Sequence, residues 1–317
     1  MKLIIQIPCL NEEKTLPLVF EGMPKKIDGI DIIETMIIDD GSSDKTIKVA
    51  RKLGVNHIVI HKQNKGLGVA FKTGINKALL EGADILVNTD GDNQYPSKYI
   101  EELVRPIIED KADIVIGDRQ TSKVAHFSLL KKFLQWLGST LVRFLSGSKV
   151  PDSVSGFRAY SRESLLRLNI TTRFSYVLDT IIQASKKGLK TDYIKITTNS
   201  PTRPSRLFKN MFQHIIKSTK DLFRVYAMHN PIRLFFALGL PFLIIGLFGI
   251  SRFLYFYYLN PIDTGKVQSL ILAGTSLIIA IQFFALGIIG DIINKNKLLL
   301  EDNLYLTKKN YYKKNSN

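Results

Sequence analysis

Short apolar runs alternate with helix-period patterns along roughly the first 200 residues. The runs are four or five residues long, as strands are, and several segments between them repeat apolar residues every three or four positions. The predicted strands are Leu3–Ile7, Thr35–Asp39, His57–His61, Ile85–Thr89, Ile114–Gly117 and Tyr193–Thr197, and the predicted helices include Glu13–Lys26, Lys45–Leu53, Gly68–Glu81 and Ser97–Glu109. Such alternation indicates an α/β fold with a mostly parallel sheet, in which ligands bind beyond the carboxyl ends of the strands.

Two much longer apolar stretches follow. Leu234–Ser251 and Val267–Gly290 contain no charged residue, and a helix needs about 20 apolar residues to cross a bilayer. Buried core helices are the alternative, but lengths this great favour a transmembrane hairpin that turns at Asn260-Pro261. Lys and Arg residues flank the pair while the connector is nearly neutral, so the positive-inside rule predicts two cytoplasmic termini. Since Met1-Lys2 runs directly into a strand-like segment, no signal peptide is predicted.

The basic charge is concentrated in the middle of the chain. The 317 residues include 44 Lys or Arg and 28 Asp or Glu, a net charge of +16. Residues 1–118 carry a net −4, with 15 basic and 19 acidic side chains, whereas residues 119–233 carry +16, with 21 and 5. A segment this one-sided suggests a nucleic acid, an anionic membrane or a phosphorylated substrate as partner, against the alternative of a solvated lysine-rich surface.

Composition excludes several classes of protein. The apolar content is too high for a disordered chain, and the glycine and cysteine counts exclude a collagen-like or disulfide-framework protein. The single Cys9 excludes an internal disulfide and a zinc site built on cysteines, and the five histidines lack metal-ligand spacing.

Polar clusters follow three of the predicted strands. Their sequences are Pro8-Cys9-Leu10-Asn11-Glu12, Asp39-Asp40-Gly41-Ser42 and Asp90-Gly91-Asp92-Asn93-Gln94. Asp90 and Asp92 place two hard oxygen ligands together with Gln94 within reach, which suits Mg²⁺ or Mn²⁺ holding a diphosphate. A D-x-D alone is often only a turn, but its place after a strand and beside two other clusters favours a metal site.

The glycine-rich segment Asn64–Gly68 does not fit a nucleotide fingerprint. It contains G-x-G but lacks the third glycine of the dinucleotide motif, and it follows the third strand rather than the first. We interpret it as a glycine turn before a helix. The chain also contains no G-x-x-x-x-G-K-[ST] loop, so a P-loop nucleotidase is not expected.

The ordered motifs resemble a known family. P-x-L-N-E, I-D-D-G-S-S-D-K-T, N-K-G-L-G-x-A, D-G-D-N-Q-Y-P, G-D-R and D-S-x-S-G-F-R look like glycosyltransferase family 2 with the A-type fold. Within it, the chain is similar to dolichol-phosphate mannosyltransferases and bacterial polyprenyl-phosphate glycosyltransferases. The resemblance covers about residues 1–210, and the two apolar stretches match the two-helix members of that group.

The resemblance implies roles for residues at the donor site. Pro8, Leu10 and Glu12 would line the nucleoside pocket, with Glu12 accepting hydrogen bonds from ribose, while Ile38 and Asp40 would contact the base. Asp90, Gly91, Asp92 and Gln94 would carry the metal and the diphosphate, and Arg119, Arg203 and Arg206 would offset phosphate charge. Ser205-Arg206-Leu207 stands at the family's E-S-K-L segment, with Arg in place of Lys.

The implied reaction is an inverting sugar transfer to a lipid phosphate. Lys131 or Lys132 stands where relatives hold the acceptor phosphate with an Arg and a following Ser. Asp152 and Asp179 are candidates for a general base by position, although each could equally have a structural role. A phosphate monoester is already ionised near pH 7, so the reaction does not require a strong general base. Asp92, Arg119, Asp152 and Asp179 thus form the predicted catalytic set.

The predicted organisation follows the chain. Residues 1–204 form a cytoplasmic catalytic domain, 205–230 basic amphipathic interfacial helices, 231–259 and 266–290 two transmembrane helices, and 291–317 a cytoplasmic polar tail. A second basic amphipathic segment, Phe127–Leu145, faces either the membrane or the core. Expected partners are a GDP- or UDP-linked sugar, polyprenyl or dolichyl phosphate and membrane lipids, without nucleic acid. A homo-oligomer through the membrane helices stays open.

Rival functions fit the sequence less well. A processive polysaccharide synthase would carry Q-x-x-R-W, yet the only tryptophan is Trp136 in a different context. A nucleic-acid-binding membrane protein lacks any helix-turn-helix or RNA-binding signature. A non-catalytic nucleotide-sugar-binding protein is disfavoured by the intact Asp90, Asp92 and Gln94 set, and a family 2 enzyme acting on another lipid or glycan acceptor stays the alternative.

Overall fold

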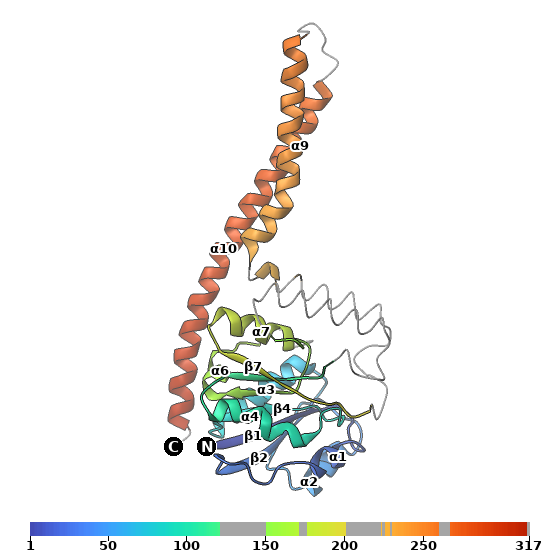
Figure 1. Cartoon of the computed structure of the whole chain (residues 1–317), viewed down its shortest axis with the longest axis vertical. Coiled ribbons are helices and arrows are strands. Elements are labelled where there is room, and N and C mark those ends of the chain that lie inside the picture. Colours follow the sequence, from blue (N-terminus) through green and yellow to red (C-terminus); the bar gives the residue numbers. More distant parts are fainter. Residues whose placement is uncertain are drawn as a thin grey trace. The chain divides into compact units, whose positions relative to one another are not determined.

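A seven-stranded sheet organises the N-terminal part of the chain. Figure 1 shows the computed structural model, which describes residues 1–120, 150–170, 176–200, 223, 226–228, 230–259 and 267–315. The strands of the described residues are β1 (Lys2–Cys9), β2 (Ile32–Asp39), β3 (His57–Ile60), β4 (Ile85–Asn88), β5 (Ile114–Asp118), β6 (Arg158–Ser161) and β7 (Thr191–Lys195). Their order is β3-β2-β1-β4-β6-β5-β7, and only β6 runs antiparallel to its neighbours. The predicted mostly parallel α/β fold is confirmed.

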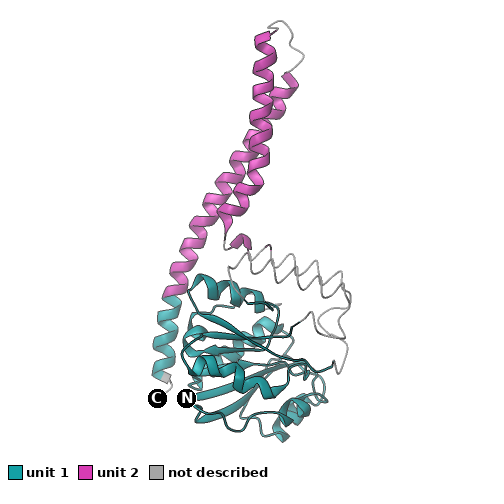
Figure 2. Cartoon of the chain, viewed as in Figure 1, with its two compact units in different colours: residues 1–209, 303–317 teal, residues 210–302 magenta. Residues whose placement is uncertain are grey.

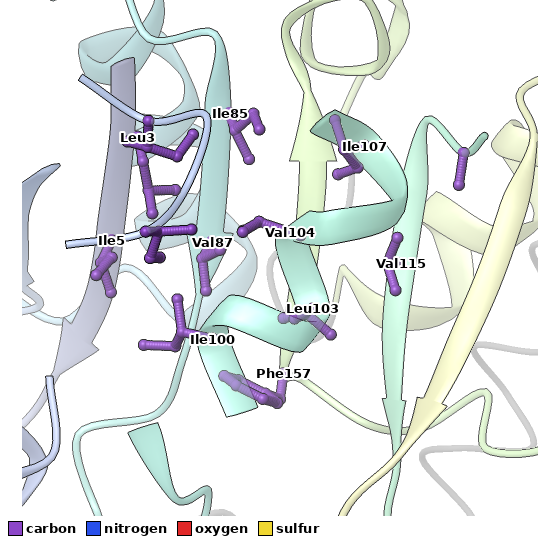
Figure 3. Packing of buried hydrophobic residues seen from close by; sticks show 14 of the residues in the cluster. Leu3, Ile5, Ile85, Val87, Ile100, Leu103, Val104, Ile107, Val115 and Phe157 are labelled. Atoms are coloured by element: carbon purple, nitrogen blue, oxygen red, sulfur yellow. The ribbon is translucent and has the colours of Figure 1, made fainter. Parts of the chain in front are cut away.

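Helices cover both faces of this sheet. They are α1 (Leu16–Glu21), α2 (Thr46–Lys52), α3 (Leu67–Leu80), η1 (Ser97–Tyr99), α4 (Ile100–Ile108), α6 (Arg162–Arg167) and α7 (Val177–Lys186). Leu3 and Ile5 on one face of β1 share a buried cluster with Leu103 and Val104 of α4, and Figure 3 shows α4 lying across the strands. β1 is an interior strand that is apolar on both faces except at Gln6, and it is buried along nearly its whole length.

The first predicted helix is shorter than its sequence pattern suggested. Glu13–Lys26 was expected, whereas α1 spans Leu16–Glu21, since Gly22 caps the helix and Pro24 follows. The predicted helix at Ser97–Glu109 begins as the 3₁₀ turn η1 and continues as α4. Sequence analysis missed β6, which begins at Arg158, the last residue of the D-S-x-S-G-F-R motif.

Two compact units divide the chain. The first consists of residues 1–209 and 303–317, and the second of residues 210–302 (Figure 2). The second unit contains α9 (Pro231–Leu259) and most of α10 (Val267–Asn315). Both helices are long and apolar enough to cross a membrane, and only 11% and 17% of their most apolar windows are buried. A core helix of a soluble protein would be mostly buried, so the composition fits a membrane hairpin.

Glycines allow α9 and α10 to approach each other closely. A Cβ added at Gly246 would lie 2.6 Å from the Leu277 Cγ, and one at Gly239 would lie 2.7 Å from the Phe284 ring. Phe235 and Phe283 stack with ring centroids 6.4 Å apart. Small residues at such crossings are how helices associate where no water is present to drive apolar contact.

The end of α10 packs on the first unit. Tyr305 donates a hydrogen bond of 3.0 Å to Glu163 on α6, and Lys308 donates one of 3.1 Å to the Leu168 carbonyl oxygen. Tyr312 lies 3.2 Å from the Asn76 amide oxygen on α3. The polar segment predicted as a tail is therefore helical as far as Asn315, and its last turns belong to the same unit as the sheet.

Candidate functional site

The predicted polar clusters meet at one edge of the sheet. β1 lies between β2 and β4, with Cys9 paired to Asp39 and Gln6 paired to Asn88. The segments that follow these three parallel strands therefore emerge side by side at their carboxyl ends. The chain turns to opposite sides of β1 at this point, which is the topological switch where open α/β sheets bind ligands.

The D-x-D segment passes directly over the end of β1. A Cβ at Gly91 would lie 3.1 Å from the Cys9 sulfur and 3.2 Å from the Glu12 Cγ, so only glycine fits there without displacing them. The Asp92 carboxylate accepts a hydrogen bond from the Gln94 amide at 3.1 Å, and Asn93 has a φ of +58°. This turn sets the direction of both aspartates.

The donor set suits a hard divalent cation that also binds phosphate. The described residues contain no group of three His, Cys, Asp or Glu side chains that could hold a metal ion by themselves. Mg²⁺ is usually held by only one or two carboxylates and takes its remaining ligands from water and substrate phosphates. Asp90 and Asp92, with Gln94 beside them, therefore fit an ion that arrives with a diphosphate.

A buried polar network of Gln6, Asn88 and Tyr176 lies under the D-x-D segment, on the side of the sheet core. Asn88 of β4 accepts from Gln6 at 3.1 Å and donates to the Tyr176 hydroxyl at 2.7 Å and to the Gly156 carbonyl at 3.0 Å. A Cβ at Gly156 would lie 3.4 Å from the Asp90 carboxylate. Burial raises the pKa of Tyr176 well above its ordinary value, so this hydroxyl stays a neutral donor.

Arg119 and Asp152 form a buried ion pair beside Asp90. The guanidinium donates to both carboxylate oxygens, at 2.6 and 3.0 Å, and the Arg119 amide donates at 3.3 Å. Burial alone would raise the pKa of Asp152, but the charge and hydrogen bonds of Arg119 hold it below its ordinary value. Burial alone would lower the pKa of Arg119, but Tyr95, Asp152 and Asp90 raise it. The pair is therefore fully charged, and both oxygens of Asp152 are engaged with Arg119.

Tyr95 lies beside the Arg119–Asp152 ion pair. Its hydroxyl accepts a hydrogen bond from the Gly156 amide at 3.2 Å, and its ring stacks on Phe157 with centroids 5.3 Å apart. Burial, with the nearby negative charge of Asp90 and Asp152, raises its pKa to about 12. Tyr95 thus links the D-x-D turn to the loop that carries Asp152.

Arg158 holds the loop of residues 153–156 against α7. Its fully buried guanidinium donates to the Ser153 and Ser155 carbonyl oxygens at 3.0 and 2.8 Å. It also donates to the Val177 carbonyl oxygen at 2.9 Å in the first turn of α7, where Asp179 lies buried. This side chain fixes the distance between the loop and the helix that carry the two base candidates.

Asn199 ties the D-x-D turn to the segment after β7. Its side chain donates to the Asn93 carbonyl oxygen at 2.8 Å, and its amide donates to the Gln94 carbonyl oxygen at 3.0 Å. Arg203 and Arg206 follow a few residues later in the sequence but lie outside the described residues. Lys131, Lys132 and the segment Phe127–Leu145 are likewise not described, and of residues 205–230 the structure describes 223, 226–228 and 230.

The predicted nucleoside residues lie along the ends of β1 and β2. Pro8 and Ile38 are buried, and Leu10 is half-buried. Glu12 is 5% exposed and accepts from the Thr15 hydroxyl at 2.7 Å. Asp40 is 6% exposed and accepts from His61 and from the amides of the loop after β3.

Sequence reasoning missed four side chains that shape this site. His61, Tyr176 and Asn199 stood in no motif, and Arg158 closed a motif without an assigned role. Only His61 carried a signal, because it ends a predicted strand next to the one that bears Asp40.

Comparisons with known proteins agree with this geometry. Residues 4–168 match glycosyl transferase family 2. A UDP-N-acetylglucosamine–dolichyl-phosphate N-acetylglucosaminyltransferase from Methanococcus voltae is 34% identical over 215 residues, which are 61% of this chain and 83% of the relative. A dolichyl-phosphate hexose transferase from Haloferax volcanii is 30% identical over 186 residues, 59% of this chain and 78% of that protein.

The solved structures agree on the fold. Glucosyl-3-phosphoglycerate synthase from Mycobacterium tuberculosis, crystallised with Mn²⁺, UDP and glucosyl-3-phosphoglycerate, superposes with a TM-score of 0.53 at 22% identity. The match covers 71% of this chain and 78% of that one. The sheet order, the D-x-D turn over β1 and the family match all lead to one assignment. The chain belongs to glycosyl transferase family 2.

Proposed function

We propose that the protein transfers a sugar from a nucleotide-diphosphate sugar to a polyprenyl phosphate at a membrane. The observation that carries this proposal is the D-x-D turn seated on the end of β1 in a family 2 domain that is followed by two apolar helices. Two relatives at 30% identity or more are named as dolichyl-phosphate sugar transferases. A lipid acceptor also explains why a sugar transferase would carry a membrane hairpin.

The donor diphosphate would lie across Asp90, Asp92 and Gln94. Mg²⁺ or Mn²⁺ bound there would offset the charge that develops on the leaving nucleoside diphosphate. Arg119 lies close enough to Asp90 for that carboxylate to raise its pKa, and we assign its charge to the same diphosphate. Arg203 and Arg206, four and seven positions after Asn199, are proposed to add to it.

The acceptor phosphate is proposed to attack the anomeric carbon from the face opposite the nucleotide. Lys131 or Lys132 would hold this phosphate, in the segment with the largest basic excess. An ionised phosphate oxygen is already a nucleophile, so positioning and charge neutralisation supply most of the catalysis. We assign Asp152 the role of orienting Arg119, because both its oxygens contact that side chain. For Asp179 the roles of base and of helix anchor stay open.

The hairpin is proposed to keep the catalytic domain on the cytoplasmic face. Residues 305–312 contact other residues of the first unit, which supports a hairpin whose two ends lie on the same side of the membrane. An even number of crossings, as two spans provide, satisfies this condition. The basic flanks of the pair favour the cytoplasm as that side.

Transfer to lipid tests the proposal directly. Full-length protein in detergent would be incubated with Mn²⁺, undecaprenyl or dolichyl phosphate and a panel of labelled nucleotide sugars. We expect label to enter the organic phase with at least one donor, and we expect omission of the lipid phosphate to abolish it. Label that stays in water with every donor would contradict the lipid acceptor.

A further inference from the structure

The Asp40 carboxylate at the end of β2 is enclosed by the loop that follows β3. Gly41, with a φ of +83°, lets this loop approach so closely that a Cβ there would lie 2.9 Å from the Asn64 amide nitrogen. As a result, the amides of Lys65 and Gly66 point at Asp40, donating at 3.0 Å to Oδ1 and at 2.9 Å to Oδ2. The glycine-rich segment Asn64–Gly68 is therefore more than a turn before a helix, because two of its amides bind the Asp40 carboxylate.

His61 donates to Asp40 Oδ1, the oxygen that also accepts from the Lys65 amide. Its Nδ1 lies 2.7 Å from Asp40 Oδ1, and because a carboxylate only accepts, Nδ1 is the donor. The other ring nitrogen, Nε2, lies 3.0 Å from the Thr73 hydroxyl on α3, which fixes the ring from behind. Both His61 and Asp40 are 6% exposed, so the pair is a rigid part of the fold rather than a surface contact.

Counting acceptor positions leaves room for one further donor. A carboxylate offers about four lone-pair positions, two on each oxygen. Within the part of the chain that the structure describes, Oδ1 accepts from His61 and Lys65, and Oδ2 accepts from Gly66. A ligand can therefore place one N–H group on Oδ2, but it cannot engage both oxygens side by side.

The charge distribution places the nucleoside over this end of the sheet. Asp40 directly follows β2, which lies next to β1 and the D-x-D turn. Arg119 directly follows β5, which lies on the other side of β4. The charge of Arg119 attracts the diphosphate to that side of the site, so the uncharged base would extend toward Asp40.

We infer that Asp40 and His61 select a uracil base, which makes the donor a UDP-linked rather than a GDP-linked sugar. The uracil edge presents a single N3–H, which matches the single open position on Oδ2. The guanine edge presents N1–H and N2–H together, and one of these donors would find no acceptor and lose its hydrogen bond with water. His61 is the positioning residue, because it fills Oδ1 and fixes the carboxylate. This inference rests on the proposed use of a nucleotide sugar but not on the lipid acceptor.

Binding of free nucleotides tests the inference without any transfer reaction. Full-length protein in detergent with Mn²⁺ would be titrated calorimetrically with UDP, GDP and CDP. We expect UDP to bind about tenfold or more tightly than either. CDP is the sharper comparison, because cytosine has the size of uracil but carries an acceptor at N3. Equal or tighter binding of GDP or CDP would overturn the inference.

Variants of His61 separate positioning from mere packing. His61→Leu removes the donor to Asp40, so the UDP preference should fall to within about threefold and the KM for the nucleotide sugar should rise while kcat changes little. His61→Asn offers an N–H near the position of Nδ1 and should restore most of the preference. His57→Leu is the matched control, because His57 begins the strand that His61 follows but is bonded to Glu34, and this variant should keep the UDP preference. An unchanged preference in His61→Leu would refute the role of His61.

The outcomes distinguish this inference from the proposed function. UDP selectivity without any lipid product would support uracil selection and contradict the lipid acceptor. Lipid product formed from a GDP-linked sugar in preference to its UDP-linked counterpart would support the lipid acceptor and contradict uracil selection.

Discussion

Removing Asp152 should destabilise the catalytic domain by leaving Arg119 buried without its counter-ion. Arg119 is 8% exposed and Asp152 is 3% exposed, so neither charge can turn to water without local unfolding. Breaking such a pair from one side typically costs about 3–5 kcal/mol. Two charge-assisted hydrogen bonds, at 2.6 and 3.0 Å, would be lost, and at about 1.5–3 kcal/mol each they give the same magnitude.

The assay is denaturant unfolding of the full-length protein in detergent, followed by circular dichroism and by proteolysis of the catalytic domain. We expect Asp152→Ala to lose about 3–5 kcal/mol of unfolding free energy. The double variant Arg119→Met/Asp152→Leu should recover a large part of this loss, because it removes both charges and fills the space. Both variants should lose activity, since Arg119 is gone or displaced.

A different result would reassign Asp152. If Asp152→Asn unfolded within about 0.5 kcal/mol of the wild type while kcat fell by about 1000-fold, the carboxylate would act in the chemical step rather than hold Arg119. The pH dependence gives a second check. Because the folded pKa is depressed, the pair stabilises the protein above the unfolded pKa of about 3.9 and loses this contribution as pH falls through the folded value. Acid unfolding of the wild type should therefore be steeper than that of Asp152→Asn.

Three further predictions concern the metal turn and the C-terminal helix. Asp92→Asn should lower metal-dependent transfer about 100-fold or more while the fold is kept, and full activity of this variant would move the metal elsewhere. Asn199→Ala should weaken Mn²⁺ binding about tenfold, because Asn93 loses the hydrogen bond that holds the turn. Mn²⁺ affinity would be measured by electron paramagnetic resonance with nucleotide present, and an unchanged affinity would show that this contact is only structural. Lys308→Met should cost about 1–2 kcal/mol of unfolding free energy, because it loses the hydrogen bonds to Leu168 and Asn169. Lys295, whose ion pair is with Asp291 of its own helix, gives the control Lys295→Met, and an equal loss there would argue against docking.

The sequence predicted the sheet and the convergence of its polar ends for a clear physical reason. Buried parallel strands are continuous apolar runs. Asp40 and Asp90 each come directly after a predicted strand, and Asp92 lies two residues beyond Asp90. β6 could not be predicted in the same way, since its four residues pair antiparallel with β4 and β5 only because of the fold around them.

The contacts between distant segments escaped sequence reasoning. Asn199 and Asn93 are 106 residues apart, and Arg158 reaches from one motif to the first turn of α7. Neither contact leaves a periodic or spaced pattern in the chain. His61 shows the same limit, because its role depends on the register of β3 against β2, which brings it beside Asp40.

The most direct test of the proposed function is the fate of a labelled sugar. Full-length protein, Mn²⁺, polyprenyl phosphate and a UDP-linked sugar with tritium in the sugar ring would be incubated and partitioned between water and organic solvent. The account predicts labelled lipid that requires the phosphate on the lipid, and that disappears with Asp92→Asn. Label confined to the aqueous phase with every donor tested, from protein that binds UDP, would contradict it.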